Sequence, residues 1–155
     1  EIAQEREWNH DASLDWHLLQ NADNRGVQAL VGDLNRLYST LPALHELDCE
    51  GGGFAWIDCN DYEQGVLSYR RHGRDTNHTA VVVCNFTPVP RQDYEVGVPN
   101  GGMWREAFNS DSGFYGGTNM GNTGSVQASA KSVHGLDYSL ALTVPPLAAL
   151  VLVPE

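Results

Sequence analysis

The densest cluster of chemically capable side chains lies near the N-terminus, where Trp8-Asn9-His10-Asp11 is followed by Asp15-Trp16-His17. Three interpretations of this cluster stay open. His and Asp are common metal ligands, but His10 and His17 match no HExxH or HxH spacing, which disfavours a metal site. The same polar groups can satisfy helix ends and a loop. Trp rings also stack on sugar faces while Asn, Asp and His bind hydroxyl groups, so sugar contact is the third interpretation.

Other catalytic chemistries find no support in the motifs. Glycoside hydrolysis needs two carboxylates about 5–9 Å apart across the scissile bond, and the scattered Asp and Glu residues show no spacing that selects a pair. There is no GxSxG elbow and no Cys beside a recognisable His partner. The Gly-rich stretch Phe114–Asn122 lacks both GKS/T and GxGxxG, so a loop is favoured over a phosphate cradle. The motifs therefore predict no catalytic residue, no metal site and no cofactor in this chain.

The elements that must position the N-terminal cluster are expected to be helical. A short helix is predicted over Leu14–Leu19, capped by the polar residues before it. Asn21–Gly26 is rich in Asn, Asp and Gly and is expected to break the pattern. Val27–Leu41 then carries apolar residues at spacings of three and four, which predicts an amphipathic helix that Pro42 ends.

Beyond about residue 46 the pattern becomes that of β-structure. Gly51–Gly53 is expected to be a flexible break, and Ser110–Gly124 a long loop. Between and around them lie short apolar runs separated by turn residues, at a spacing typical of a sandwich or barrel. The eight runs are Phe54–Asp58, Gly65–Arg71, Thr79–Phe86, Tyr94–Val98, Met103–Asn109, Ser125–Ser129, Tyr138–Val144 and Leu147–Val153.

Two of these runs are apolar on both faces, Ala80–Cys84 and Leu147–Val153. We expect them to lie centrally in the sheets, one of them also facing the helical part. Four aromatic residues of the β region can form either a sugar-binding platform or a core, and core is favoured because Trp56 and Trp104 lie inside strand-like runs. The four are Trp56, Trp104, Phe108 and Tyr115.

The composition excludes several classes of partner. The formal net charge is −11, from 20 acidic against 9 Lys and Arg residues, which argues against nucleic acid and anionic membrane surfaces. No apolar run approaches the roughly 20 residues of a membrane span. The three cysteines, Cys49, Cys59 and Cys84, form no CxxC pair and indicate reduced thiols in a cytoplasmic protein. The chain opens on Glu1 without a Met, which we interpret as a cut inside a longer protein.

Several stretches, which together cover essentially the whole chain, carry a family resemblance. Arg6–Leu19 resembles the signature that follows the last barrel strand in bacterial glycogen (1,4-alpha-glucan) branching enzymes, which belong to the alpha-amylase superfamily. The other stretches are similar to the helix that closes that barrel, to the entry of the C-terminal β domain, and to its later strands. They are Asp33–Tyr38 and Leu41–Glu46, then Phe54–Asp58, then Val83–Pro90 and Pro145–Leu152.

The resemblance implies a mainly β fold, an antiparallel β-sandwich of the amylase C-terminal type preceded by a helical remnant of a (β/α)8 barrel. Residues 1–45 are then the end of the catalytic barrel domain and residues 46–155 the all-β domain. Such enzymes cut an α-1,4 glucan and transfer the piece to a 6-hydroxyl through a retaining mechanism with an Asp nucleophile and a Glu acid–base. Those carboxylates sit on earlier barrel strands, so this chain alone is predicted to be inactive.

The resemblance also implies where substrate contact remains. Trp8, Asn9, Asp11 and Trp16 are expected to border the active cleft of the intact enzyme, with Trp8 as the first candidate. The expected partners are α-glucan and the barrel domain of the same polypeptide. The apolar stripe of the Val27–Leu41 helix is expected to be exposed in this chain, which predicts self-association.

Two rival interpretations stay open. The chain can be a free-standing carbohydrate-binding β-sandwich module, which predicts that it binds glucan by itself. It can also come from another superfamily member, such as a debranching or trehalose-forming relative, although the Trp8–Asp11 run argues against this.

Overall fold

Alternation of apolar and polar residues gives most strands one face to bury, and the strands pair accordingly into two antiparallel sheets. The structure is a computed structural model that describes residues 1–155. One sheet has six strands in the order β1-β2-β3-β8-β5-β6, and the other pairs β4 with β7. The strands are β1 (Phe54–Asp58), β2 (Val66–His72), β3 (Thr79–Asn85), β4 (Arg91–Val98), β5 (Gly102–Asn109), β6 (Ser125–Ala128), β7 (Tyr138–Val144) and β8 (Ala148–Pro154).

The strand prediction and the fold class are confirmed, since each of the eight predicted runs overlaps one strand and every pairing is antiparallel. The main core lies between the two sheets, where Trp104, Leu140 and Leu150 are fully buried. Each such side chain stabilises the fold by about 1.5–3 kcal/mol relative to an exposed one. The predicted long loop between β5 and β6 is also present, with one short 3-10 turn inside it.

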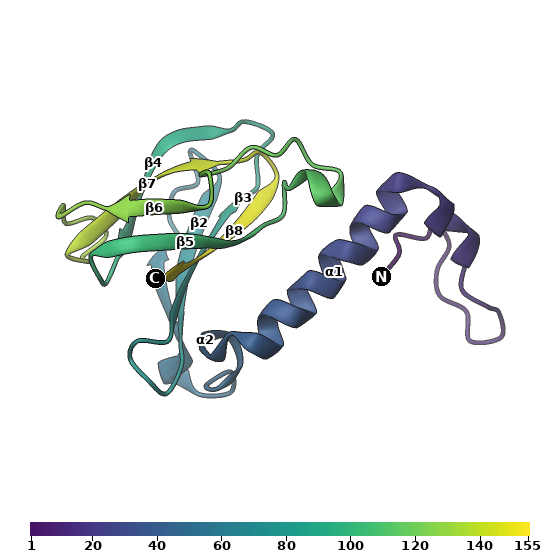
Figure 1. The fold of residues 1–155 in the computed structure, drawn as a ribbon, viewed down its shortest axis with the longest axis horizontal. Coiled ribbons are helices and arrows are strands. Elements are labelled where there is room, and N and C mark those ends of the chain that lie inside the picture. The colour runs from purple at the N-terminus through teal and green to yellow at the C-terminus, as the bar shows by residue number, and fades with distance from the viewer.

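The helical part precedes the sheets and leans against the six-stranded one (Figure 1). In Figure 1, α1 extends away from the β domain, and the N-terminal segment lies at the end of α1 that is farther from the sheets. No helix of the chain has both the length and the apolarity that crossing a membrane requires. The helices are η1 (Trp16–Gln20), α1 (Ala22–Thr40), α2 (Pro42–His45), η2 (Gly51–Gly53) and η3 (Gly113–Tyr115), of which the η elements are 3-10 turns.

A second apolar cluster joins the helices to the outer face of the six-stranded sheet. Val82 of β3 and Val151 of β8 contribute to it, with Leu37 and Leu41 of the helical part packed against them. β3 and β8 are the two central strands of this sheet. The prediction of central strands that also face the helical part is therefore confirmed.

The expectation of a wholly exposed helix stripe is wrong, because α1 has two apolar rows. Leu30, Leu37 and Leu41 pack against the cluster on the sheet. A second row, Val27, Val31, Leu34 and Tyr38, lies to one side, and Leu34 and Tyr38 are exposed. Val27 and Val31 are half-buried, so the part of the stripe that is open to solvent is Leu34 and Tyr38.

The expected break at Asn21–Gly26 is also wrong, since α1 begins at Ala22. Asn21 keeps an extended backbone as the N-cap, and Asp23 lies in the first turn, where a negative charge suits the helix dipole. The side chain of Asn24 donates to the Ile2 carbonyl at 2.7 Å instead of competing with the helix. The end at Pro42 is confirmed, because α1 stops at Thr40 and Pro42 starts α2. The short helix predicted over Leu14–Leu19 is a 3-10 helix that begins two residues later and ends one residue later, at Trp16–Gln20.

The glycine triplet forms the turn η2, and its last residue is packed, contrary to the expected flexible break. A side chain at Gly53 would collide with the Leu47 carbonyl, whereas Gly51 and Gly52 are exposed. The Gly53 carbonyl accepts a hydrogen bond from the Arg71 Nε at 3.0 Å, which ties the turn to β2.

Candidate functional site

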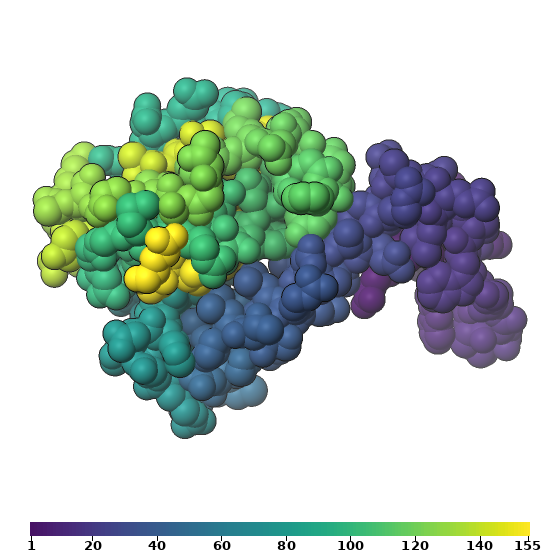
Figure 2. Space-filling model, viewed as in Figure 1, coloured from purple at the N-terminus to yellow at the C-terminus, as the bar shows by residue number.

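The N-terminal segment is held to the first turns of α1. Ile2 is buried, and Asn24 of α1 donates to the carbonyls of Ile2 and Ala3 at 2.7 and 3.2 Å. Arg25 donates to the carbonyls of Leu19 and Gln20 at 2.9 and 2.7 Å, which satisfies the end of η1. These contacts place the whole segment at the end of α1 that lies farther from the β domain (Figure 2).

A charged pair closes the loop that carries the predicted cluster. Arg6 donates to both carboxylate oxygens of Asp15, with Nε at 3.2 Å from Oδ2. The hydrogen bonds from Arg6 hold the pKa of the Asp15 carboxyl below its ordinary value. Asp15 therefore remains ionised at neutral pH and fixes the two ends of the loop to each other.

Asn9 and Asp11 form the turn at the tip of this loop. The Asn9 side-chain oxygen accepts the Asp11 backbone N–H at 2.9 Å, and the Ala12 N–H reaches the Asn9 carbonyl at 3.2 Å. Asp11 lies 3.3 Å from His10, and both side chains are exposed. The polar groups thus satisfy their own loop, as the second interpretation of the cluster expects.

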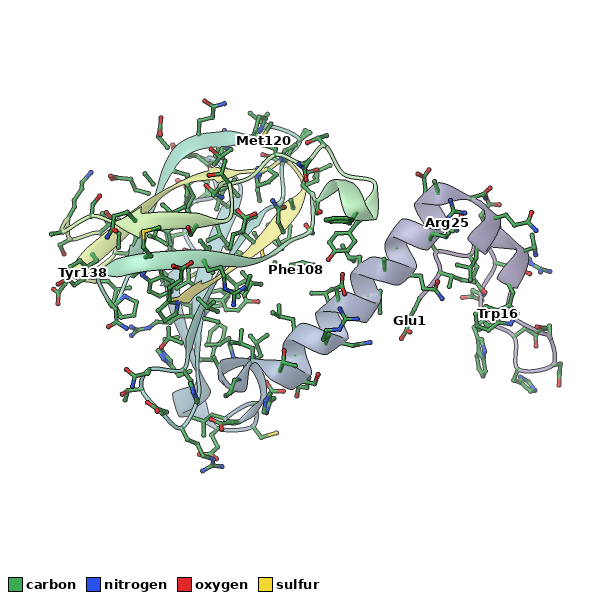
Figure 3. All side chains as sticks on the ribbon, in the orientation of Figure 1. Glu1, Trp16, Arg25, Phe108, Met120 and Tyr138 are labelled. Atoms are coloured by element: carbon green, nitrogen blue, oxygen red, sulfur yellow. The ribbon has the colours of Figure 1, made fainter.

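Trp8 and Trp16 line one open cleft of about 680 Å³ between the N-terminal segment and α1. Ile2 and Leu14 of the N-terminal segment and Val31 of α1 are the other apolar residues that line this cleft. The indoles are exposed by 71% for Trp8 and 55% for Trp16. Figure 3 places Trp16 at the end of the molecule remote from the β domain. Of the four predicted residues, the structure brings these two together and leaves Asn9 and Asp11 outside this cleft.

The cleft has the chemistry of a surface that contacts a neutral, hydroxyl-rich molecule. Indole faces stack on pyranose rings, and side chains such as Gln28 and Asn35 can donate to and accept from hydroxyls. Glu1 is the one carboxylate among the lining residues, so a pair of facing carboxylates is absent from the cleft. The chain contains no group of three or more His, Cys, Asp and Glu side chains that can hold a metal ion.

A second aromatic surface lies on the β domain, where a sugar-binding platform that includes Trp56 was the less favoured alternative and Phe54 and Tyr69 were not candidates. Phe54 and Trp56 of the edge strand β1 meet Tyr69 of β2, with ring centroids 4.9 to 6.0 Å apart. Trp56 is 54% exposed, so its assignment to the core is wrong. The helical part packs around the central strands β3 and β8, so the outer face of the edge strand β1 is left uncovered. The signal was the i, i+2 spacing of Phe54 and Trp56, which places both on one face.

The other three aromatic residues that were expected to be core are buried or half-buried. Trp104 is fully buried and its indole nitrogen donates to the Asn100 carbonyl at 3.1 Å. Phe108 is buried in the cluster below the helices, with the half-buried Tyr115 packed beside it. These three positions therefore belong to packed parts of the fold, which leaves Trp8, Trp16 and the β1–β2 aromatic surface as exposed candidates.

Comparison with known proteins gives one family and many relatives. The family described as "Alpha amylase, C-terminal all-beta domain" matches residues 56–155. The chain is 56% identical over all 155 residues to a 1,4-alpha-glucan branching enzyme GlgB of Rhodospirillum rubrum. It is 54% identical over 99% of its length to that of Cereibacter sphaeroides and 52% identical over its full length to GlgB 1 of Xanthomonas campestris. In each case the match covers 21% of the relative, so the chain spans about a fifth of the length of these proteins.

Proposed function

Because the chain belongs to the alpha-amylase C-terminal all-beta domain family, we propose that it is the C-terminal portion of a 1,4-alpha-glucan branching enzyme. The observation that supports this proposal best is that the sequence is 52–56% identical, over at least 99% of the chain, to enzymes of that name. The intact protein transfers α-1,4-glucan segments to 6-hydroxyls and so forms α-1,6 branches. This portion supports the fold of the enzyme and contacts glucan, but it does not catalyse the reaction alone.

Residues 1–45 are the end of the catalytic barrel domain in this proposal, and residues 46–155 are the all-β domain. The open row of α1 supports the division. Val27, Val31, Leu34 and Tyr38 recur at the spacing of one helix face, and Leu34 and Tyr38 are 39% and 47% exposed. A helix gains most of its stability from packing an apolar face, so a partner surface in the remainder of the polypeptide accounts for this row.

The absence of catalysis from this portion is supported by the state of its carboxylates. A retaining glycoside reaction needs two carboxyl groups about 5–5.5 Å apart and free to act. One acidic surface is lined by Asp58, Asp61, Asp93 and Glu95. Asp61 accepts the Tyr94 hydroxyl at 2.7 Å, Asp58 lies 3.5 Å from His134, and Glu95 pairs with Lys131. Three of the four carboxylates are therefore engaged with other side chains of the β domain.

Trp8 and Trp16 are the proposed glucan contacts of the cleft, and Asn9 and Asp11 contribute from the turn beside it. The shared cleft and the exposed indoles support the first two residues. The aromatic surface of Phe54, Trp56 and Tyr69 favours the alternative, a carbohydrate-binding module that needs no other domain. Stacking of a sugar on an exposed aromatic residue is chemically equivalent at either place.

The remaining expectations about partners are part of the same proposal. The partners are α-glucan and the barrel domain of the same polypeptide, and the net charge of −11 supports the exclusion of nucleic acid and of anionic membranes. A cytoplasmic location is supported by three free thiols. Copies of this chain associate with each other through the open row of α1.

The test is electrophoresis of the 155-residue chain through native gels with and without glycogen. We expect glycogen to retard the chain, and Trp8→Ala and Trp16→Ala to abolish the retardation. Tyr62→Ala is the matched control, because Tyr62 is 86% exposed, does not line the cleft and makes no ring contact with Phe54, Trp56 or Tyr69. Loss of retardation in Trp56→Ala alone would favour the free-standing module, and unchanged mobility of the parent chain would contradict glucan contact by this portion.

The catalytic half of the proposal has a separate test. The full-length protein that contains this sequence should lower the iodine absorbance of amylose as branches form, whereas the 155-residue chain should leave it unchanged. Activity in the short chain would contradict the assignment of the catalytic carboxylates to the rest of the polypeptide.

A further inference from the structure

The direction of α1 decides where the N-terminal cleft lies. α1 has 19 residues, and at 1.5 Å per residue it is about 28 Å long. Leu37 and Leu41 fix its C-terminal end to the six-stranded sheet, and Leu30 packs against the same apolar cluster nearer the middle of the helix. Without a contact closer to the N-terminal end of α1, a small rotation about these residues would displace Trp8 and Trp16 by a larger distance.

A second attachment comes from the tip of the loop between β5 and β6. The backbone of Tyr115 in η3 lies so close to α1 that a Cβ at Gly26 would collide with the Tyr115 carbonyl. Gly26 is the only buried residue of α1. Two helix turns further along the same face, Asp33 accepts the Tyr115 hydroxyl at 2.9 Å. Burial and this hydrogen bond raise the pKa of Tyr115 to about 12, so the donor proton is retained at neutral pH.

The loop that presents Tyr115 is internally tied. The Asp111 carboxylate accepts the backbone N–H groups of Thr118 and Met120, each at 3.0 Å, and the Thr118 hydroxyl. Burial acts to raise the pKa of Asp111, but the hydrogen bonds from Thr118 and Met120 together lower it. Gly117 lies against the Asp111 carbonyl with no room for a side chain. The loop is thus ordered by its own bonds before it meets α1.

Both ends of the loop are rooted in the sheets. Asn109, at the end of β5, donates to Glu106 at 3.0 Å and to the Met120 carbonyl at 2.8 Å. Asn122 donates to Glu106 at 2.7 Å, and exchanges two hydrogen bonds with the backbone of Thr143 in β7. The tip is therefore carried by β5 and β7 together, on the side where it meets α1 (Figure 1).

From these contacts we infer that the Ser110–Gly124 loop is a rigid arm that sets the direction of α1, with Tyr115 as its positioning residue. The contacts of Tyr115 with Gly26 and Asp33 extend the packing of Leu30, Leu37 and Leu41 toward the N-terminal end of α1, and together they fix the direction of the helix axis. The arm thereby fixes the place of Trp8 and Trp16 relative to the β domain. Only the link to glucan rests on the proposed function, since the geometric part holds for any ligand.

The test measures the distance between spin labels by pulsed electron resonance in the 155-residue chain. One label is placed on the exposed Cys59 of the β domain and the other on Gln20→Cys in η1, with Cys49→Ser and Cys84→Ala removing the other thiols. Gly26→Ala is expected to shift the distance distribution. Gly32→Ala is the matched control in the same helix, because a side chain at Gly32 meets nothing within 4 Å.

The hydroxyl contact is tested in the same labelled chain. Tyr115→Phe and Asp33→Ala are expected to broaden the distribution, whereas Asp33→Asn keeps an acceptor oxygen and should restore the parent width. Parent-like distributions in both Gly26→Ala and Tyr115→Phe would overturn the inference. So would an equal shift in Gly32→Ala. A shifted distance with unchanged retardation by glycogen would leave the arm supported and count against glucan contact at the cleft.

Discussion

Arg6 and Asp15 join the two ends of a loop whose tip is a self-contained turn. Asp15 is mostly buried as a side chain while Arg6 is exposed. Exposed ion pairs add little to global stability, but a carboxylate held by two guanidinium hydrogen bonds has a defined geometry. The pair therefore orders the segment between them, which contains Trp8, more than it stabilises the fold.

The pH dependence of this loop follows from the pKa of Asp15. Because that pKa is lower in the folded chain, its contribution is present above the ordinary carboxyl value of about 3.9 and is lost as the pH falls through the folded pKa. We expect the indole NMR signals of Trp8 and Trp16 to shift in that acidic range. Asp15→Asn should produce the acidic spectrum at pH 7. Asp11→Asn, at an exposed position, should not, and an identical effect of both variants would contradict the role of the pair.

The buried side-chain amide of Asn85 stabilises two of the turns that connect the strands. Asn85 ends β3 and is 2% exposed. Its amide nitrogen donates to the carbonyls of Val89 and Pro145, both at 2.9 Å, and its oxygen accepts the backbone N–H and hydroxyl of Thr87 at 2.9 and 2.8 Å. One side chain thus joins the turn after β3 to the turn before β8. This explains why the Asn85–Pro90 stretch has so distinctive a sequence.

Removal of that amide should weaken both turns. Asn85→Ala removes the donor of the buried Pro145 carbonyl, one of the two donors of the Val89 carbonyl, and the acceptor of the Thr87 hydroxyl and N–H. A buried polar group left without its partner costs about 1–3 kcal/mol. We expect the free energy of unfolding in urea to fall by about 2–4 kcal/mol. Asn77→Ala, in an exposed loop, should change it by less than about 0.5 kcal/mol. Equal midpoints for the two variants would show that Asn85 is not a junction.

For the molecule as a whole, the open row of α1 has a consequence in solution. Leu34 and Tyr38 remain exposed although Leu30 and Leu37 are packed. Exposed apolar patches favour association, so light scattering should show oligomers that grow with protein concentration. Leu34→Gln with Tyr38→Gln should give a monomer, while Phe114→Gln, at the exposed tip of the arm, should leave association unchanged. A strictly monomeric parent at high concentration would contradict this prediction.

The sequence predicted the β-architecture well because alternation and turn residues are local signals. Ala80–Cys84 and the last run were placed centrally, since a strand apolar on both faces needs cover on both, and the sheet order bears this out. The start of α1 at Ala22 was not predictable from the local sequence. Asn24 is tolerated in the helix because its side chain donates to the Ile2 carbonyl, and a local pattern does not show a contact between residues so far apart in the chain.

The arrangement of the candidate site residues was harder to predict from the sequence than the strands. Residue types selected Trp8 and Trp16, but only the fold shows that they share a cleft and that Asn9 and Asp11 complete a turn. Trp56 sits in a strand-like run, and its exposure follows from the place of β1 at the sheet edge. Strand order is a property of the complete fold, so the period of a single run does not contain it.

The central place of β8 also bears on how the domain is made. β3 and β5 leave the ribosome before β8, the strand that pairs with both of them. Until Ala148–Pro154 emerges, β3 and β5 each lack the partner of one edge, and unpaired strand edges recruit other chains. Completion of the sheet therefore waits for the synthesis of its last strand, and a message truncated shortly before residue 148 would yield an aggregation-prone product in place of a slightly shorter domain.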